Sequence, residues 1–199
     1  MKRPDRSLVA DPGRIVVLNG ASSSGKTSLA KAMQLKSELP LHHVQLDAFR
    51  AMEPPGYWAG WETREEASTQ KMMSALCGAM YATVLQYSCH GQQVVLDVAL
   101  TNRHARRLLV EYLQDWPVYL VGVHCSAPEL ERRERARGDR DVELAASQID
   151  WLHRRMLYDV QIDTTDKKPE DLAAEVLGWL ASSPAPIALN EVRRLQHGA

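Results

Sequence analysis

A glycine-rich loop stands near the start of the chain, between a short apolar run and a stretch of good helix formers. The loop, residues 20–27, consists of Gly-Ala-Ser-Ser-Ser-Gly-Lys-Thr and matches the phosphate-binding pattern G-x-x-x-x-G-K-S/T at every fixed position. Residues 14–19 before it are apolar and β-branched, which predicts a buried strand, and residues 28–34 after it predict a helix. This strand–loop–helix context indicates that the pattern is a genuine phosphate-binding site.

The residue types in the loop suit a nucleoside triphosphate with its magnesium ion. Glycines at both ends allow close approach of the backbone, so that successive N–H groups form a nest for an anion at a helix N-terminus. Lys26 is expected to reach the β- and γ-phosphates, and the Thr27 hydroxyl is expected to bind Mg²⁺. We therefore predict nucleotide contacts from Gly20, Ala21, Ser22, Ser23, Ser24, Gly25, Lys26, Thr27 and Ser28.

Composition places the chain among soluble globular proteins. Its 199 residues suit one domain with a full core, and its net charge of −1 gives no support for a nucleic-acid or membrane-surface partner. Three cysteines without metal-site spacing favour a reducing compartment. No apolar run is long enough for a secretory signal or a membrane span. We expect a cytoplasmic protein without nucleic-acid or membrane partners, and a homo-oligomer is left open.

Alternation of apolar strands with helices predicts an α/β fold. Strands are expected at residues 14–19, 41–46, 94–98, 118–123 and 160–163. Helices are expected from the loop to about 38, at 63–89, at 103–114, through the charged stretch 127–158 and at 169–180, whereas residues 48–62 hold too many prolines and glycines for a regular element. The pattern predicts a three-layer domain over residues 14–182 with a five-stranded parallel sheet. Residues 1–13 are expected to form a flexible arm, and residues 183–199 a tail with a helical turn or two.

Two aspartates follow apolar strands on the same edge of the expected sheet as the loop. Ligands of such sheets bind at the carboxyl ends of the strands, so Gly20, Asp47 and Asp97 are expected to share a cleft. Asp97 suits Mg²⁺ binding beside Thr27, or a bond to the backbone. Asp47 could accept a proton from a substrate hydroxyl or cap the element that follows it, and the sequence leaves both interpretations open.

An arginine-rich stretch lies at residues 131–140, with five arginines in ten residues. Arg133 and Arg137 stand four apart and share a helix face, and Gly138 would end that helix. In a phosphate-loop protein such arginines are expected in a lid that neutralises the transferred phosphoryl group. The alternative is a solvated face with pairs such as Glu131–Arg135. Guanine-specific switch proteins are disfavoured because neither Asn-Lys-x-Asp nor Asp-x-x-Gly occurs in the chain.

Several motifs together resemble chloramphenicol phosphotransferase and its relatives. They are G-A-S-S-S-G-K-T, L-D-A, V-V-L-D-V, R-E-R-A-R-G-D-R and I-D-T-T-D-K, in matching order over most of residues 14–180. The resemblance implies a P-loop kinase fold with an arginine-rich lid, ATP and Mg²⁺ as cofactors, and Asp47 as the base toward the acceptor hydroxyl. It further implies that Asp97 lies at the metal, that Arg133, Arg137 and Arg140 are lid arginines, and that the turn containing Thr165 lies near the adenine.

The sequence thus predicts an ATP-dependent kinase for a hydroxyl of a small molecule, such as an antibiotic of the chloramphenicol type. Asp47, Lys26 and Arg137 are the expected catalytic residues, and Thr27 and Asp97 are the expected metal ligands. Residues 48–62, with Trp58 and Trp61, depart from the family pattern, so the acceptor is left open. The alternatives are a kinase of a metabolite, nucleoside or nucleotide-sugar, as in zeta-type toxins, and a nucleotide-binding regulator without transfer activity.

Overall fold

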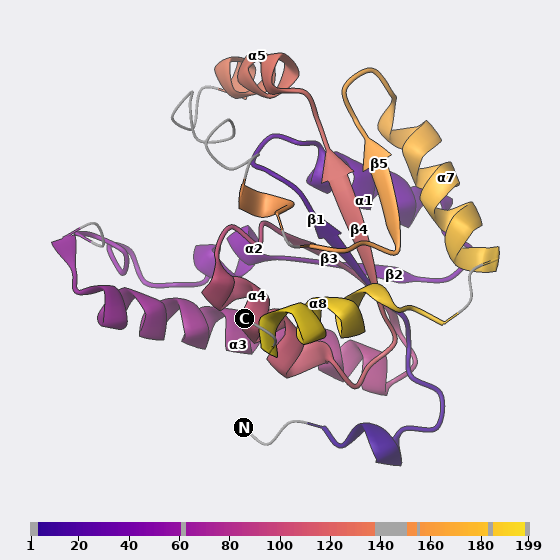
Figure 1. Ribbon diagram of the computed structural model, residues 1–199, viewed down its shortest axis with the longest axis horizontal. Coiled ribbons are helices and arrows are strands. Elements are labelled where there is room, and N and C mark those ends of the chain that lie inside the picture. The colour runs from indigo at the N-terminus through magenta and orange to yellow at the C-terminus, as the bar shows by residue number, and fades with distance from the viewer. Residues whose placement is uncertain (1–3, 61–62, 138–150, 155, 183–184, 198–199) are drawn as a thin grey trace.

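The computed structural model describes residues 4–60, 63–137, 151–154, 156–182 and 185–197. Its centre is a five-stranded sheet in the order β2-β3-β1-β4-β5, in which every neighbouring pair is parallel (Figure 1). The strands are β1 Ile15–Asn19, β2 Leu41–Gln45, β3 Gln93–Val98, β4 Val118–His124 and β5 Val160–Asp163. The predicted five-stranded parallel sheet is therefore confirmed.

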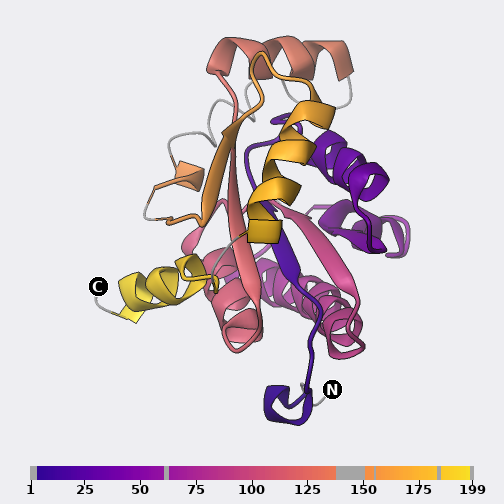
Figure 2. The ribbon, with the colours of Figure 1, turned by 90° about the vertical axis from the view of Figure 1, so that its right-hand side faces the viewer.

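Helices cover both faces of this sheet and complete three layers. The helices within the described residues are α1 Lys26–Lys36, α2 Leu46–Ala51, α3 Glu66–Cys89, α4 Arg103–Leu113, α5 Ala127–Arg137, α7 Pro169–Ser182 and α8 Ala188–His197, with a short 3-10 turn, η1, at Arg6–Leu8. α1 and α7 pack together on one face (Figure 2), and α3, α4 and α8 lie over the other. No helix within the described residues is both long and apolar enough to cross a membrane.

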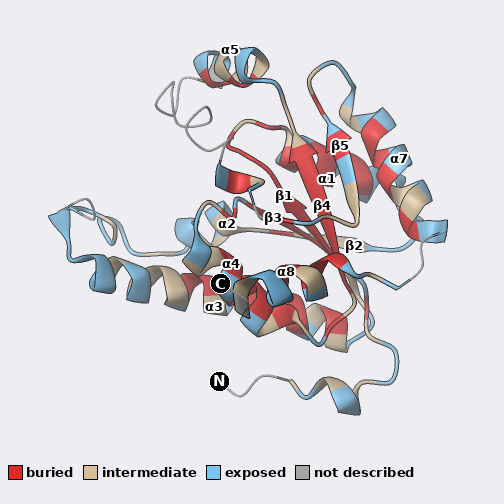
Figure 3. Ribbon diagram, in the orientation of Figure 1, coloured by how far each residue is buried: buried red, intermediate tan, exposed pale blue. Residues whose placement is uncertain are grey.

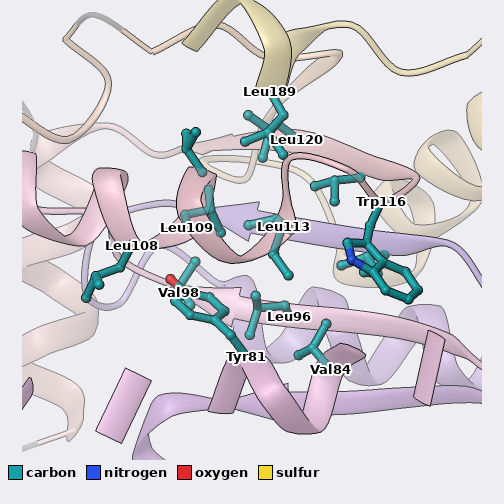
Figure 4. Packing of buried hydrophobic residues seen from close by; sticks show 14 of the residues in the cluster. Tyr81, Val84, Leu96, Val98, Leu108, Leu109, Leu113, Trp116, Leu120 and Leu189 are labelled. Carbon is teal, nitrogen blue, oxygen red and sulfur yellow. The ribbon is translucent and has the colours of Figure 1, made fainter. Parts of the chain in front are cut away.

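The central strand β1 is buried on both sides, as the red colouring of Figure 3 shows. Its alternate residues enter two separate cores, because successive side chains of a strand point to opposite faces. Val17 packs with residues of α3 and α4, and Figure 4 shows Tyr81 of α3 together with Leu109 and Leu113 of α4 in this core. Leu18 packs on the opposite face with residues of α1 and α7. Because both of its faces are buried, the strand that leads into the phosphate loop is held rigidly.

The segment after β2 differs from the sequence prediction. Residues 48–51 were expected to be irregular, but they belong to α2, so the prediction is wrong for this part. The prolines at 54 and 55 end the helix without preventing it, since the preceding residues are compatible with helix. Phe49 packs against the core and holds the helix in place.

The chain after the arginine-rich stretch also differs. Helix was expected to continue to Tyr158, but residues 156–158 are not helical. By this point the chain runs beside β4: the Asp159 N–H donates to the Leu120 carbonyl at 2.8 Å, and the Leu120 N–H donates to the Asp159 carboxylate at 2.8 Å. These bonds draw the backbone into the geometry of the sheet edge.

The end of the chain forms more helix than a turn or two. α8 spans ten residues, Ala188–His197. It is held because Leu189 and Val192 are buried in the core shared with α3 and α4, with Leu189 above Leu120 in Figure 4. Burial of these side chains supplies the stability that so short a helix lacks alone.

Candidate active site

A cavity of about 660 Å³ lies at the carboxyl ends of the strands, beside the phosphate loop. It brings together most of the residues that the sequence analysis singled out. Its walls come from the loop, the start of α2, the end of β3, α5 and the segment after β5. The lining residues are Ser22, Ser23, Gly25, Lys26, Thr27, Ser28, Leu29, Gln45, Leu46, Asp47, Asp97, Val98, Ala99, Arg132, Arg133, Ala136, Thr164, Lys167, Pro169 and Leu172.

The phosphate loop needs glycine at both of its glycine positions, for different reasons. Gly25 is the N-cap of α1 and has a φ of 89°, a left-handed conformation that side chains disfavour. A Cβ on Gly20 would lie 2.5 Å from the Val123 carbonyl oxygen, so the neighbouring strand leaves no room for a side chain. The loop is thereby held against β4, with its N–H groups at the start of α1.

Two serine hydroxyls in this loop are buried without a hydrogen-bond partner among the described residues. They are those of Ser23 and Ser24. Buried polar atoms are almost always hydrogen-bonded, so these two hydroxyls fit a ligand that offers them hydrogen-bond acceptors. The Lys26 ammonium turns back onto the loop and donates to the Ala21 carbonyl at 2.7 Å. A phosphate chain in the cavity, with its many acceptor oxygens, fits these donors.

Thr27 and Asp97 form a pair of oxygen ligands beside the phosphate site. The Thr27 hydroxyl donates to Asp97 Oδ2 at 2.6 Å, and the Lys26 ammonium lies 3.9 Å from Asp97 Oδ1. Burial alone would raise the pKa of Asp97, but His43, Lys26 and Thr27 outweigh it and hold the pKa below its usual value. Asp97 is therefore an anion at neutral pH, and the hard oxygen atoms of this pair fit Mg²⁺.

Asp47 lines the same cavity from the first turn of α2. The N-cap position of α2 is occupied by Gln45, so Asp47 is not the capping residue. A carboxylate in the first turn is nevertheless favoured by the helix dipole. Asp47 is exposed and lies on the cavity wall.

α5 presents different arginines to the site and to solvent. Arg133 points toward the loop, where its guanidinium donates to the Thr164 carbonyl at 2.7 Å and to the Ser23 carbonyl at 3.4 Å. The Glu129 carboxylate forms an ion pair with Arg133, with Oε1 lying 2.7 Å from Arg133 Nε. Hydrogen bonds from Arg132 and Arg133 lower the pKa of Glu129 to about 2. The expected pair of Glu131 with Arg135 forms at 3.2 Å on the exposed side.

The two expectations for this arginine-rich stretch thus apply to different residues. The described part of the stretch contains both an inward arginine and a solvated ion pair. Arg137 lies at the C-terminal end of α5, and only its place in the helix is described. Arg140 lies outside the described residues. Of the expected lid, the structure therefore describes only the part that lies in α5.

The turn after β5 places Thr164 on the cavity wall, next to the predicted Thr165. The Thr164 hydroxyl donates to the Ser24 carbonyl at 2.7 Å, which ties the turn to the phosphate loop. The Thr165 hydroxyl donates to the Asp163 carboxylate at 2.6 Å and accepts the Ser126 N–H at 2.9 Å. Thr165 is thus a structural part of the turn, and Thr164 and Lys167 are its cavity-facing residues.

Sequence reasoning missed a polar network at the end of β1. Asn19 accepts the Leu100 N–H at 2.9 Å and donates to the Tyr158 hydroxyl at 2.7 Å. Buried Arg106 donates to the Leu100 carbonyl at 3.3 Å and also to carbonyls of the 151–154 segment. The signal for Asn19 was a polar residue ending an otherwise apolar strand. For Arg106 no local signal exists, because its partners come from distant segments.

Comparisons with known proteins point to one family. The family model of chloramphenicol phosphotransferase-like proteins matches residues 13–181. A relative from Mycobacterium tuberculosis strain H37Rv, named "Putative O-phosphotransferase Rv2636", is 29% identical over 92% of this chain and 88% of its own length.

Solved structures of low identity share the fold. The adenosine phosphosulfate (APS) kinase CysC of Mycobacterium tuberculosis has a TM-score of 0.63 at 18% identity, covering 86% of this chain and 99% of its own. The shikimate kinase of Acinetobacter baumannii has a TM-score of 0.59 at 12% identity, covering 90% of this chain and 98% of its own. These similarities confirm the three-layer P-loop kinase fold.

Proposed function

This chain is a P-loop phosphotransferase belonging to the chloramphenicol phosphotransferase-like family, and we propose that it transfers the γ-phosphoryl group of ATP to a hydroxyl of a small molecule, foremost an antibiotic such as chloramphenicol. The observation that carries the proposal is the single cavity that holds the phosphate loop, the Thr27–Asp97 pair and Asp47. In a cell, phosphorylation of an antibiotic would give resistance to it.

The nucleotide half of the site rests on the loop. Ser23 and Ser24 offer unpaired hydroxyls, and the Lys26 ammonium would exchange the Ala21 carbonyl for a phosphate oxygen. Thr27 and Asp97 would hold Mg²⁺, which when bound neutralises charge on the β- and γ-phosphates. The proposed catalytic work of the chain itself is positioning and charge stabilisation, which dominate phosphoryl transfer.

The acceptor half begins at Asp47. Its carboxylate would take the proton of the acceptor hydroxyl while that oxygen bonds to the γ-phosphorus and the bond to the β-phosphate bridging oxygen breaks. ADP then leaves with the electron pair of the broken bond. The exposure of Asp47 to the cavity supports this assignment.

Arginines of α5 would stabilise the charge of the transferred group. Arg133 is already beside the loop, with its guanidinium between Ser23 and Thr164. Arg137 follows one helical turn later and is assigned the same role on the γ-phosphoryl group. An arginine suits this task because its planar guanidinium binds two phosphate oxygens at once.

An acceptor screen tests the proposed function. The protein is incubated with ATP and Mg²⁺ together with amphenicol antibiotics, sugars, nucleosides and nucleotide-sugars, and products heavier by one phosphate are sought by mass spectrometry. Phosphorylation of an antibiotic supports the proposal. Transfer to a metabolite or nucleotide-sugar alone would overturn the antibiotic assignment, and tight ATP binding without any acceptor-dependent ADP release would overturn transfer itself.

A further inference from the structure

A buried histidine on β2 faces the proposed metal ligand Asp97 from the neighbouring strand. In the parallel register of β2 and β3, His43 pairs with Val95 and Gln45 pairs with Asp97. His43 therefore lies two residues before the position opposite Asp97, on the same face of the sheet. Its side chain is only 9% exposed, and its Nε2 atom lies 3.7 Å from Asp97 Oδ2. This nitrogen is sealed from solvent and has no full hydrogen bond within the described residues.

The preceding histidine shows what an ordinary structural histidine looks like in this strand. His42 stacks on Tyr87 with ring centroids 4.1 Å apart, and its Nε2 bonds to the Gln92 side chain at 3.3 Å. Side chains of adjacent strand residues point to opposite faces, so His42 has no part in the Asp97 cluster. The unfilled hydrogen bond of His43 is therefore specific to the side of the strand that faces the site.

The position of His43 matters because of how few donors hold Asp97. Asp97 Oδ2 accepts the Thr27 hydroxyl at 2.6 Å in this structure. The Thr27 oxygen could offer a lone pair to Mg²⁺ while its O–H still donates to Asp97, whereas Lys26 would be drawn toward the phosphates. A second donor beside Thr27 would then restrict rotation of the carboxylate.

We propose that His43 is a positioning residue that donates its Nε2–H to Asp97 and fixes the carboxylate in the orientation required by Mg²⁺–ATP. This inference rests on the Mg²⁺ site of the proposed function. A displacement of under an ångström would bring the 3.7 Å separation into hydrogen-bond range, which is roughly 2.7–3.2 Å. The donor sits on a strand of the sheet, so it is itself held rigidly.

An imidazole N–H suits this task because the donor belongs to a ring held by the strand, whereas the Lys26 ammonium would turn toward the phosphates. Partners that orient metal ligands in this way typically change metal affinity by about 10- to 100-fold when they are removed. Glutamine could supply an N–H donor from the same place, and leucine could fill the space without one.

The experiment compares the affinity for a fluorescent ATP analogue in the presence of Mg²⁺ and in the presence of EDTA. The gain in affinity from Mg²⁺ is the readout, and it requires no acceptor. For His43→Leu we expect that gain to fall about 10-fold or more while metal-free binding is unchanged. His43→Gln should restore most of the gain, and the matched control His42→Leu should retain all of it.

Thermal unfolding of each variant shows whether the fold survives. His43→Leu should unfold at a temperature no lower than the wild type, since it removes a buried donor that lacks a full bond. The proposal is overturned if His43→Leu keeps the full Mg²⁺ gain, if His43→Gln is as impaired as His43→Leu, or if metal-free binding falls equally.

Asp97→Asn separates this inference from the proposed function. If that variant keeps the Mg²⁺ gain, the metal site itself is misassigned and the role of His43 falls with it. If Asp97→Asn loses the gain while His43→Leu keeps it, the metal site stands and only the positioning role is overturned.

Discussion

The Thr27 hydroxyl donates a 2.6 Å hydrogen bond to Asp97, although the two residues are 70 positions apart in the chain. Thr27 lies in the first turn of α1 and Asp97 near the end of β3, and the sheet order places β3 directly beside β1. The pair is therefore preformed before any nucleotide binds. If the pair binds Mg²⁺ as proposed, it needs little reorganisation when the cation arrives, which is the property expected of a phosphotransferase site.

Asp47→Asn is expected to slow phosphoryl transfer by about 100- to 10,000-fold, the usual contribution of a general base. ATP affinity should be unchanged if Asp47 lies on the acceptor side of the cavity, as proposed. Steady-state turnover with the acceptor and direct ATP-binding titrations measure the two effects. Full turnover in this variant would show that Asp47 is not the base.

Arg133→Ala should destabilise the fold as well as weaken nucleotide binding. The substitution leaves the Thr164 carbonyl without its 2.7 Å donor and should reduce the free energy of unfolding by about 1–3 kcal/mol. Arg135→Ala, which breaks an exposed pair with Glu131, is the matched control and should change it by less than about 1 kcal/mol. Urea titration of both variants measures the difference, and equal effects would contradict the anchoring role of Arg133.

Gly122→Ala tests the packing below the site. A Cβ at this buried strand position would lie 2.7 Å from the Tyr158 ring, so the ring and its bond to Asn19 would have to shift. We expect a loss of about 1–3 kcal/mol in the free energy of unfolding. Gly178→Ala is the control on α7: nothing lies within 4 Å of its new Cβ, and it should stabilise the helix by about 0.5–1 kcal/mol. Tolerance of Gly122→Ala would mean that Tyr158 packs loosely.

His153 should make the protein less stable in mild acid. Burial, followed by the charges of His124 and Arg106, lowers the pKa of His153 from 6.5 to about 4. The unfolded chain therefore binds a proton between these pH values while the folded chain does not, so stability falls as pH falls from 6.5 toward 4. Because the ring is only half-buried, we expect a loss of about 1 kcal/mol from this group at pH 5.

The variant His153→Asn isolates that loss. It should lose less stability than the wild type between pH 7.5 and pH 5, as measured by unfolding midpoints at each pH. His90→Asn, at an exposed histidine that ends α3, should retain the wild-type dependence. Parallel behaviour of all three proteins would assign the acid sensitivity to other groups.

Much of the fold and nearly half of the residues that line the cavity could be predicted from local patterns. The strands were recognisable because buried parallel strands are continuous apolar runs. The loop was recognisable because its glycines and its lysine stand at the fixed positions of a phosphate-binding pattern. The errors fell where tertiary contacts decide the local structure. Phe49 anchors a short helix that the nearby prolines had obscured, and Asp159 draws its neighbours onto the edge of β4.

The sequence by itself determined the α/β alternation, the phosphate loop and the presence of acids at the strand ends, because each depends on spacing within one segment. Only the tertiary structure decided which distant groups meet. The order of the strands brings Asp97 next to Thr27, and the register of β2 and β3 brings His43 next to Asp97. Packing of the 151–154 segment gives Arg106 its hydrogen-bond partners. Such contacts depend on the crossovers between strands and on burial, neither of which is encoded in the neighbours of a residue along the chain.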